Sequence, residues 1–277
     1  MPAAAQDHMH HEPPAAVSAP GKGDAGAREP GATAQAPDEA LPSFIPVLTD
    51  QDRAAAFGAG LKGHHAHDRA VNYFVLFDQF EVQAGGGETS GGWDSQGWIG
   101  RDRDRFWFRT EGERSAGRFE DAEAHLLYGR AVSRWWEVVA GVRQDVRPGP
   151  SRTWAAVGIQ GLAPQWFEVE ATAYVGESGR TQFRLETEYE LLLTNRLVLQ
   201  PRVELQIDGR DDPSRGVGAG LSSIGTGLRL RYELKREFAP YIGVAWDRRL
   251  FGTADYAEAD GESARRTSFV FGVRFWR

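Results

Sequence analysis

The chain has 277 residues, with 32 Lys and Arg against 39 Asp and Glu, 33 Gly, 9 Trp and no Cys. The lack of cysteine excludes disulfide frameworks, thiolate zinc sites, iron–sulfur clusters and cysteine nucleophiles. The formal net charge of -7 provides no basic field for a phosphate backbone, so we expect no nucleic acid partner.

Residues 1–68 have the composition of a segment that does not fold on its own. They hold eight of the 14 prolines and only two aromatic side chains, Phe44 and Phe57. Such a segment cannot bury enough apolar surface to offset its conformational entropy, so we expect a disordered arm. Within it, a short helix is expected over residues 50–57, where Asp50 caps an alanine-rich run.

Six of the seven histidines form two tight clusters in this arm. With one methionine, these candidate metal ligands are His8, Met9, His10, His11, His64, His65 and His67. Imidazoles one or two residues apart on a flexible segment can surround one cation, and copper(II) binds such sites more tightly than nickel or zinc. We therefore predict that the arm binds a copper ion. The alternative is that the clusters are histidine tracts without function, or that one belongs to an expression tag.

From about residue 69 the sequence alternates polar and apolar residues, which predicts β-strands. In residues 183–191, for example, the odd positions are apolar apart from Thr187, whereas the even positions are Arg184 and three glutamates. The predicted strands are twelve in number and cover 70–84, 91–100, 104–115, 118–130, 134–147, 151–162, 165–176, 180–193, 196–208, 222–234, 238–250 and 265–276. An even number is what a closed single-chain outer-membrane barrel requires.

The fold predicted for residues 69–277 is all-β: a closed antiparallel 12-stranded transmembrane β-barrel of the Gram-negative outer membrane. Both long connections, 208–221 and 251–264, follow odd-numbered strands, so an arm in the periplasm puts both of them outside the cell. Indoles that suit the lipid headgroup level lie near strand ends at Trp135, Trp136, Trp154, Trp166 and Trp276. A soluble barrel or sandwich shows the same alternation, but a lipocalin-type calyx needs only eight strands.

The charged face of these strands must point inward in a membrane, because an arginine facing lipid costs about 2–4 kcal/mol at the bilayer midplane. The predicted lumen residues include Glu111, Glu113, Asp121, Glu123, Arg184, Glu186, Glu188, Arg202 and Glu204. An acidic lumen attracts cations, although small barrels also fill their interiors with salt bridges for stability. His125 has the same parity as Asp121, and we expect it in the lumen, either as a metal ligand or as a packed member of a polar network.

Several short motifs of the barrel region carry a family resemblance. They are QGWIG at 96–100, RFWFRTEGE at 105–113, LYGR at 127–130, GVRQD at 141–145, YEL at 189–191, PRVE at 201–204, YE at 232–233, APYIGV at 239–244 and GVRFW at 272–276. As a set, they resemble the copper resistance protein B family of outer-membrane proteins. The resemblance implies a contribution to periplasmic copper resistance, a periplasmic multicopper oxidase as partner, and an amino-terminal segment rich in Met and His. Because Met9 is the only methionine of the arm besides Met1, we expect histidine imidazoles rather than methionine thioethers to be the main copper ligands.

We therefore expect an outer-membrane protein without catalytic residues, which binds copper with its arm and exports or sequesters it through the barrel. One alternative is a general diffusion pore, and another is a barrel that anchors a periplasmic copper oxidase without transport of its own. A membrane-embedded lipase would need a Ser and a His together on the outer wall, whereas His125 is predicted to lie inside.

Overall fold

The computed structural model describes residues 49–56, 70–147 and 149–277. The two histidine clusters lie outside the described residues. The predicted short helix is confirmed as α1, Asp50–Ala56, and belongs to a unit separate from the barrel. Its cap is Thr49 rather than Asp50: the Thr49 hydroxyl accepts a hydrogen bond from the backbone N–H of Asp52 at 3.2 Å, and the Asp52 carboxylate accepts one from the backbone N–H of Thr49 at 2.9 Å.

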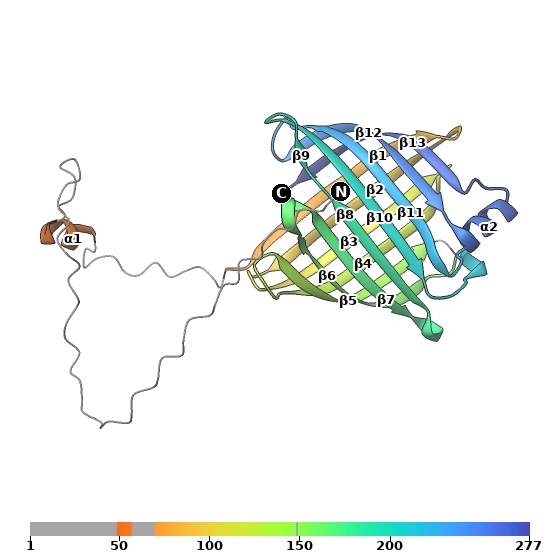
Figure 1. Ribbon diagram of the computed structural model, residues 1–277, viewed down its shortest axis with the longest axis horizontal. Coiled ribbons are helices and arrows are strands. Elements are labelled where there is room, and N and C mark those ends of the chain that lie inside the picture. The colour runs from red at the N-terminus through yellow and green to blue at the C-terminus, as the bar shows by residue number, and fades with distance from the viewer. Residues whose placement is uncertain (1–48, 57–69, 148) are drawn as a thin grey trace, which may run out of the picture. The chain divides into compact units, whose positions relative to one another are not determined.

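The rest of the described chain is a closed antiparallel β-barrel (Figure 1). Its strand segments are β1 (Asn72–Gly85), β2 (Glu88–Gly100), β3 (Asp104–Ser115), β4 (Arg118–Ala131), β5 (Trp136–Arg147), β6 (Arg152–Leu162), β7 (Glu168–Gly176), β8 (Thr181–Glu188), β9 (Leu191–Leu192), β10 (Leu197–Asp208), β11 (Gly220–Tyr232), β12 (Phe238–Arg249) and β13 (Arg265–Trp276). Segments β8 and β9 both pair with β10 and form one interrupted strand, so the wall has twelve strands, and β1 pairs with β13 to close it. The predicted fold is confirmed.

The twelve predicted ranges match these strands to within a few residues at their ends. The largest shifts at a strand start are three residues: β7 begins at Glu168 rather than 165, and β2 begins at Glu88 rather than 91 because Gly91 and Gly92 lie inside the strand and not in a loop. The glycines Gly86 and Gly87 do form a turn, where their φ values of 63° and 86° favour residues without a Cβ.

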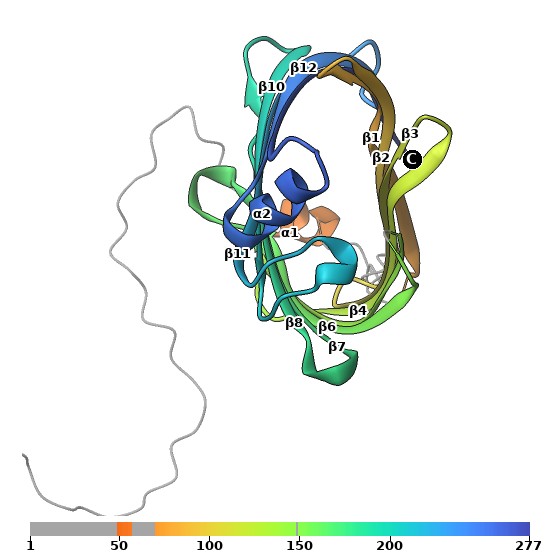
Figure 2. The ribbon, with the colours of Figure 1, turned by 90° about the vertical axis from the view of Figure 1, so that its right-hand side faces the viewer.

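The connections differ in length at the two ends of the barrel. The long ones join β10 to β11, with the 3-10 helix η3 (Pro213–Arg215), and β12 to β13, with helix α2 (Phe251–Ala259). Both lie at the same end (Figure 1), and in Figure 2 they cover part of the barrel opening. Two further 3-10 helices lie in shorter connections: η1 (Pro164–Trp166) between β6 and β7, and η2 (Glu177–Gly179) between β7 and β8. Since outer-membrane barrels have short periplasmic turns, the end with the long loops is the external one.

Large apolar side chains cover the outer wall of the barrel. The exposed ones include Phe80, Val82, Phe108, Leu126, Val142, Val157, Phe183, Leu228, Ile242, Phe269 and Phe271. A contiguous apolar surface of this kind is stable against lipid but not against water. None of the described helices is long and apolar enough to cross a bilayer. The apolar outer wall indicates that the strands span the outer membrane, with the polar residues of each strand inside.

The five tryptophans near the strand ends differ in exposure, and Trp136 and Trp276 are half-buried. Trp135 and Trp166 are exposed and pack edge to face with ring centroids 5.5 Å apart, as expected at the headgroup level. Trp154 corrects the prediction: it is only 4% exposed, and its indole N–H donates to Asp145 at 2.7 Å inside the barrel. Alternation along β6 turns Trp154 inward, where it belongs to an apolar cluster of Leu127, Val139, Trp154, Ala156 and Tyr174.

Candidate functional site

Ion pairs cross the interior of the barrel from one wall to the other. Arg184 on β8 donates to Glu123 on β4 at 2.9 and 3.1 Å, and it also contacts Glu111 on β3. Because β4 and β8 are four strands apart in the barrel, the Arg184 side chain must cross the lumen to reach Glu123. The side chain of Glu123 is only 5% exposed, so this contact is a buried ion pair.

Two further arginines make equivalent crossings. Arg202 on β10 donates to Asp94 on β2 at 2.9 Å and to Glu186 on β8 at 2.8 Å. Arg109 on β3 donates twice to Glu170 on β7, once at 3.0 Å. We call the contacts of Arg184, Arg202 and Arg109 with the opposite wall the transverse bridges. They narrow the lumen, because side chains held at hydrogen-bond distance leave no passage between the two contacting groups.

His125 lies on β4 beside the Arg184 bridge, with its side chain 5% exposed. Its Nε2 is 2.6 Å from Glu123 Oε1, and its ring meets Tyr174 edge to face at 6.0 Å. The Nδ1 atom is buried and has no hydrogen-bond partner among the described residues. His125 also lines a small cavity of about 60 Å³ together with Glu111 and Glu170. The site therefore offers one imidazole nitrogen without a hydrogen-bond partner in the described part of the chain, within a cavity lined by carboxylates and by Arg109 and Arg184.

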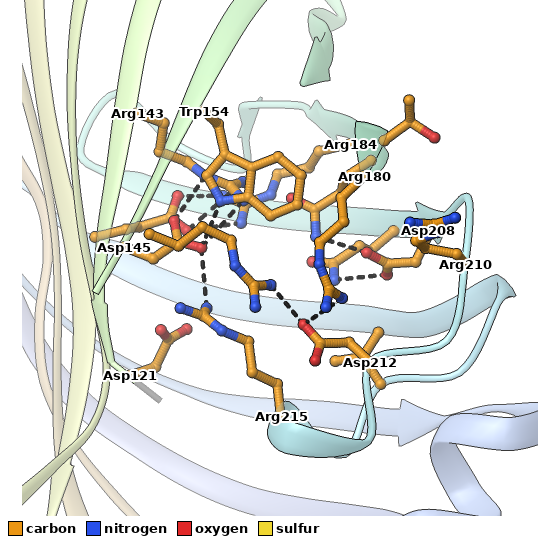
Figure 3. A pocket seen from close by; sticks show the side chains of 16 residues that line it. Asp121, Arg143, Asp145, Trp154, Arg180, Arg184, Asp208, Arg210, Asp212 and Arg215 are labelled. Atoms are coloured by element: carbon orange, nitrogen blue, oxygen red, sulfur yellow. Dashed lines mark hydrogen bonds and ion pairs between the residues drawn. The ribbon is translucent and has the colours of Figure 1, made fainter. Parts of the chain in front are cut away.

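The long connection of residues 209–219, here called the mouth loop, folds into the external end of the barrel (Figure 3). Its Asp212 is 5% exposed and pairs with Arg152 at 2.5 Å and Arg180 at 2.9 Å. Its Arg215 donates to Asp145 on β5 at 3.0 Å. The mouth loop thus closes over a cavity of about 200 Å³ that these side chains line.

The charge of Asp212 is stabilised by its neighbours. Burial alone would raise the pKa of the Asp212 carboxyl. The hydrogen bonds from Ser214 and Arg152 and the charges of Arg152 and Arg180 outweigh burial, and the pKa falls below its usual value. Asp212 is therefore ionised at neutral pH, and its ion pairs hold the mouth loop in place.

Comparison with known proteins assigns the family. The family model "Copper resistance protein B precursor (CopB)" matches residues 71–277. The chain belongs to the copper resistance protein B family. Copper resistance protein B of Escherichia coli is 53% identical over 232 residues, which cover 84% of this chain and 78% of that protein. A copper resistance protein B homolog of Pseudomonas syringae pv. tomato is 49% identical over 246 residues, which cover 89% of this chain and 83% of that protein.

Among solved structures, the NanC porin is similar to this member of the copper resistance protein B family in fold. The two superpose with a TM-score of 0.50 at 13% identity, over 74% of this chain and 99% of the porin. At that level of identity the likeness concerns the fold alone, a closed outer-membrane barrel.

In this copper resistance protein B barrel, the candidate site residues fall into two groups. Those on the strands lie on the inner face, in bridges or cavities: Glu111, Glu113, Asp121, Glu123, His125, Arg184, Glu186, Glu188, Arg202 and Glu204. Those of the amino-terminal segment lie outside the described residues: His8, Met9, His10, His11, His64, His65 and His67. Among the described residues, no group of three or more His, Cys, Asp or Glu side chains is arranged to hold a metal ion.

Sequence reasoning missed several residues of the interior. Arg152, Arg266 and Arg274 have inward parity in their strands and join ion pairs with Asp212, Glu113 and Asp78, respectively. Parity along these strands could have identified all three. The mouth loop residues Asp212 and Arg215 carry no periodic signal, so alternation could not have placed them in the barrel mouth.

Proposed function

We propose that the protein contributes to copper resistance by binding copper ions with its amino-terminal segment at the outer membrane, while the barrel anchors that segment and does not act as an open pore. Membership in the copper resistance protein B family is the observation that carries this proposal. The proposed role is one of binding rather than catalysis, and membership in the copper resistance protein B family supports it.

The proposed copper ligands are the imidazoles of two clusters, together with one thioether. They are His8, Met9, His10, His11, His64, His65 and His67. Neutral imidazole is the metal-binding form of histidine, and copper is the divalent first-row ion that such nitrogen sites favour. Inside the barrel, the Nδ1 atom of His125 is a further single ligand for an ion that enters the acidic lumen.

The transverse bridges support retention of copper over free diffusion. An ion that crosses the barrel passes Arg184 and Arg202, and we propose that it displaces them from the carboxylates that they contact at 2.8–2.9 Å. Breaking a buried ion pair costs about 3–5 kcal/mol, which slows passage strongly. We therefore propose that copper is sequestered at the amino-terminal segment, and that any export through the barrel needs rearrangement of these bridges. Docking of a multicopper oxidase stays a prediction of the family resemblance.

Calorimetry tests the binding step. The full-length protein should bind copper(II) at pH 7.5 more tightly than a variant that lacks residues 1–68, and more tightly than a full-length variant with His8, His10 and His11 changed to Gln. The matched control His125→Gln should keep the high-affinity phase, because that histidine lies in the barrel. Equal affinity of the full-length and shortened proteins would refute the proposed role of the amino-terminal segment.

Liposome flux separates anchoring from diffusion. Vesicles that contain the full-length protein should admit neither sugars nor copper at rates above those of empty vesicles. Rapid swelling in sugar solutions would instead establish a general diffusion pore.

A further inference from the structure

Two residue pairs mark the lower and upper limits of the outer face that the paired strands β12 and β13 form. Phe238 and Phe275 are partners at one end of the ladder, and Arg248 and Arg265 are partners at the other end, ten residues away along each strand. Alternation puts all four on the outer wall, together with the exposed aromatic side chain of Trp246. Both arginines are exposed.

The distance between these limits matches the thickness of the membrane. Strands rise about 3.4 Å per residue, and barrel strands tilt about 35–45° from the membrane normal. Ten residues therefore climb about 25 Å, which is the height of the lipid-facing band of an outer-membrane barrel. With Phe238 and Phe275 at the short-turn end, the arginine pair lies at the headgroup level of the external leaflet. Trp246, two residues before Arg248, suits the same interface.

Two like charges face each other here without compensation from the protein. Side chains directly opposite on antiparallel strands have Cβ atoms about 4.5–5.5 Å apart, and like charges in this position are destabilising. Neighbouring arginines on the same ladder are neutralised, since Arg249 pairs with Glu262 and Arg266 pairs with Glu113. Neither Arg248 nor Arg265 has an acidic partner among the described residues. An anion from the surroundings would relieve this repulsion.

We infer that Arg248 and Arg265 form a binding site for the phosphate of the glycolipid of the external leaflet, the lipid A type of headgroup. Guanidinium groups bind phosphate oxygens in a bidentate manner, and the site opens toward the headgroup layer. Below the arginines, the exposed Phe269, Phe271 and Ile242 offer an apolar surface along which acyl chains can lie. A phosphate and a hydrocarbon chain joined in one molecule fit the charged and apolar parts of this face together.

Native mass spectrometry of the detergent-solubilised full-length protein tests the inference. Wild type mixed with bisphosphorylated lipid A should retain at least one lipid, and the Arg248→Gln/Arg265→Gln variant should retain at least fivefold less. The control Arg101→Gln/Arg134→Gln removes two exposed arginines from the short turns at the opposite end and should retain as much as wild type. Heat-modifiable migration on gels confirms that each variant is folded.

Binding measurements on wild type with different lipids test which part of the lipid is recognised, independently of any variant. Wild type should retain dephosphorylated lipid A at least fivefold less than the bisphosphorylated form, and inorganic phosphate at 1 mM should not displace the bound lipid. Equal retention of the dephosphorylated lipid, or of phosphatidylglycerol, would overturn the inference, as would undiminished binding by the folded Arg248→Gln/Arg265→Gln variant.

Discussion

Arg184 is the residue whose replacement tests the transverse bridges most directly. The change Arg184→Gln removes a guanidinium that pairs with Glu123, whose side chain is 5% exposed, and with Glu111 and Glu204, whose side chains are 27% and 30% exposed. Loss of one partner from a buried pair costs about 3–5 kcal/mol, whereas the two more exposed contacts add about 0–1 kcal/mol each.

The expected loss lies near the lower end of that range. Glu123 keeps His125 at 2.6 Å and Arg143 at 3.8 Å, which limits the cost of its uncompensated charge. We expect the free energy of unfolding to fall by about 3 kcal/mol. Urea titration of the protein in detergent micelles, followed by the fluorescence of its 9 Trp, measures this change.

Two comparison variants make the result specific. Arg134→Gln, on an exposed turn, should change the unfolding free energy by less than about 0.5 kcal/mol. The double variant Arg184→Gln/Glu123→Gln should recover at least about 1 kcal/mol relative to Arg184→Gln alone, because it removes the unpaired buried charge. A loss below about 1 kcal/mol for Arg184→Gln, or no recovery in the double variant, would show that the bridge is not a buried pair in the membrane.

Three further predictions concern the mouth loop and copper. The double change Asp212→Asn/Arg215→Gln removes the ion pairs that hold the mouth loop, so single-channel conductance in planar bilayers should show larger and more frequent openings than wild type. Wild type should show the same openings as the pH falls below about 4. The lowered pKa keeps the Asp212 carboxylate charged and paired above the usual pKa, and the pairing is lost only as the pH drops through the lowered pKa. If the Asp212→Asn protein still showed openings induced by acid, this explanation would be wrong. Copper affinity measured by calorimetry should weaken as the pH falls below about 6.5, where imidazoles become protonated, and an affinity unchanged between pH 7.5 and 5.5 would argue against histidine ligands.

The strands of the barrel wall could be predicted from the sequence because apolar outward-facing and polar inward-facing residues alternate there with a period of two. The charged faces of strands such as β8 could be assigned to the interior, since lipid does not tolerate them. The prediction for Trp154 is wrong because an indole suits both the headgroup level and a packed interior. Only the parity that Trp154 shares with the inward-facing Arg152 indicates that its side chain points into the barrel.

Other features depend on contacts between residues far apart in the chain. The mouth loop residues Asp212 and Arg215 find partners on β5, on β6 and at Arg180, which lies between η2 and β8, and no local pattern predicts such pairs. Helix α2 packs its Thr253 hydroxyl against the backbone N–H of Gly218, which donates to it at 2.9 Å. Alternation identifies this stretch only as a long connection, because a helix within a connection leaves no period-two signal.

The transverse bridges also constrain how the protein enters its membrane. Arg184 and Arg202 are made late in the chain, whereas Glu123 and Asp94 are made early. A hairpin inserted alone would expose one half of such a pair to hydrocarbon, at a cost of about 2–4 kcal/mol for each arginine near the midplane. Insertion of successive hairpins is therefore uphill until the opposite wall is present. The ion pairs across the interior thus favour a route in which the sheet closes, by pairing of its first and last strands, before or during its insertion into the lipid.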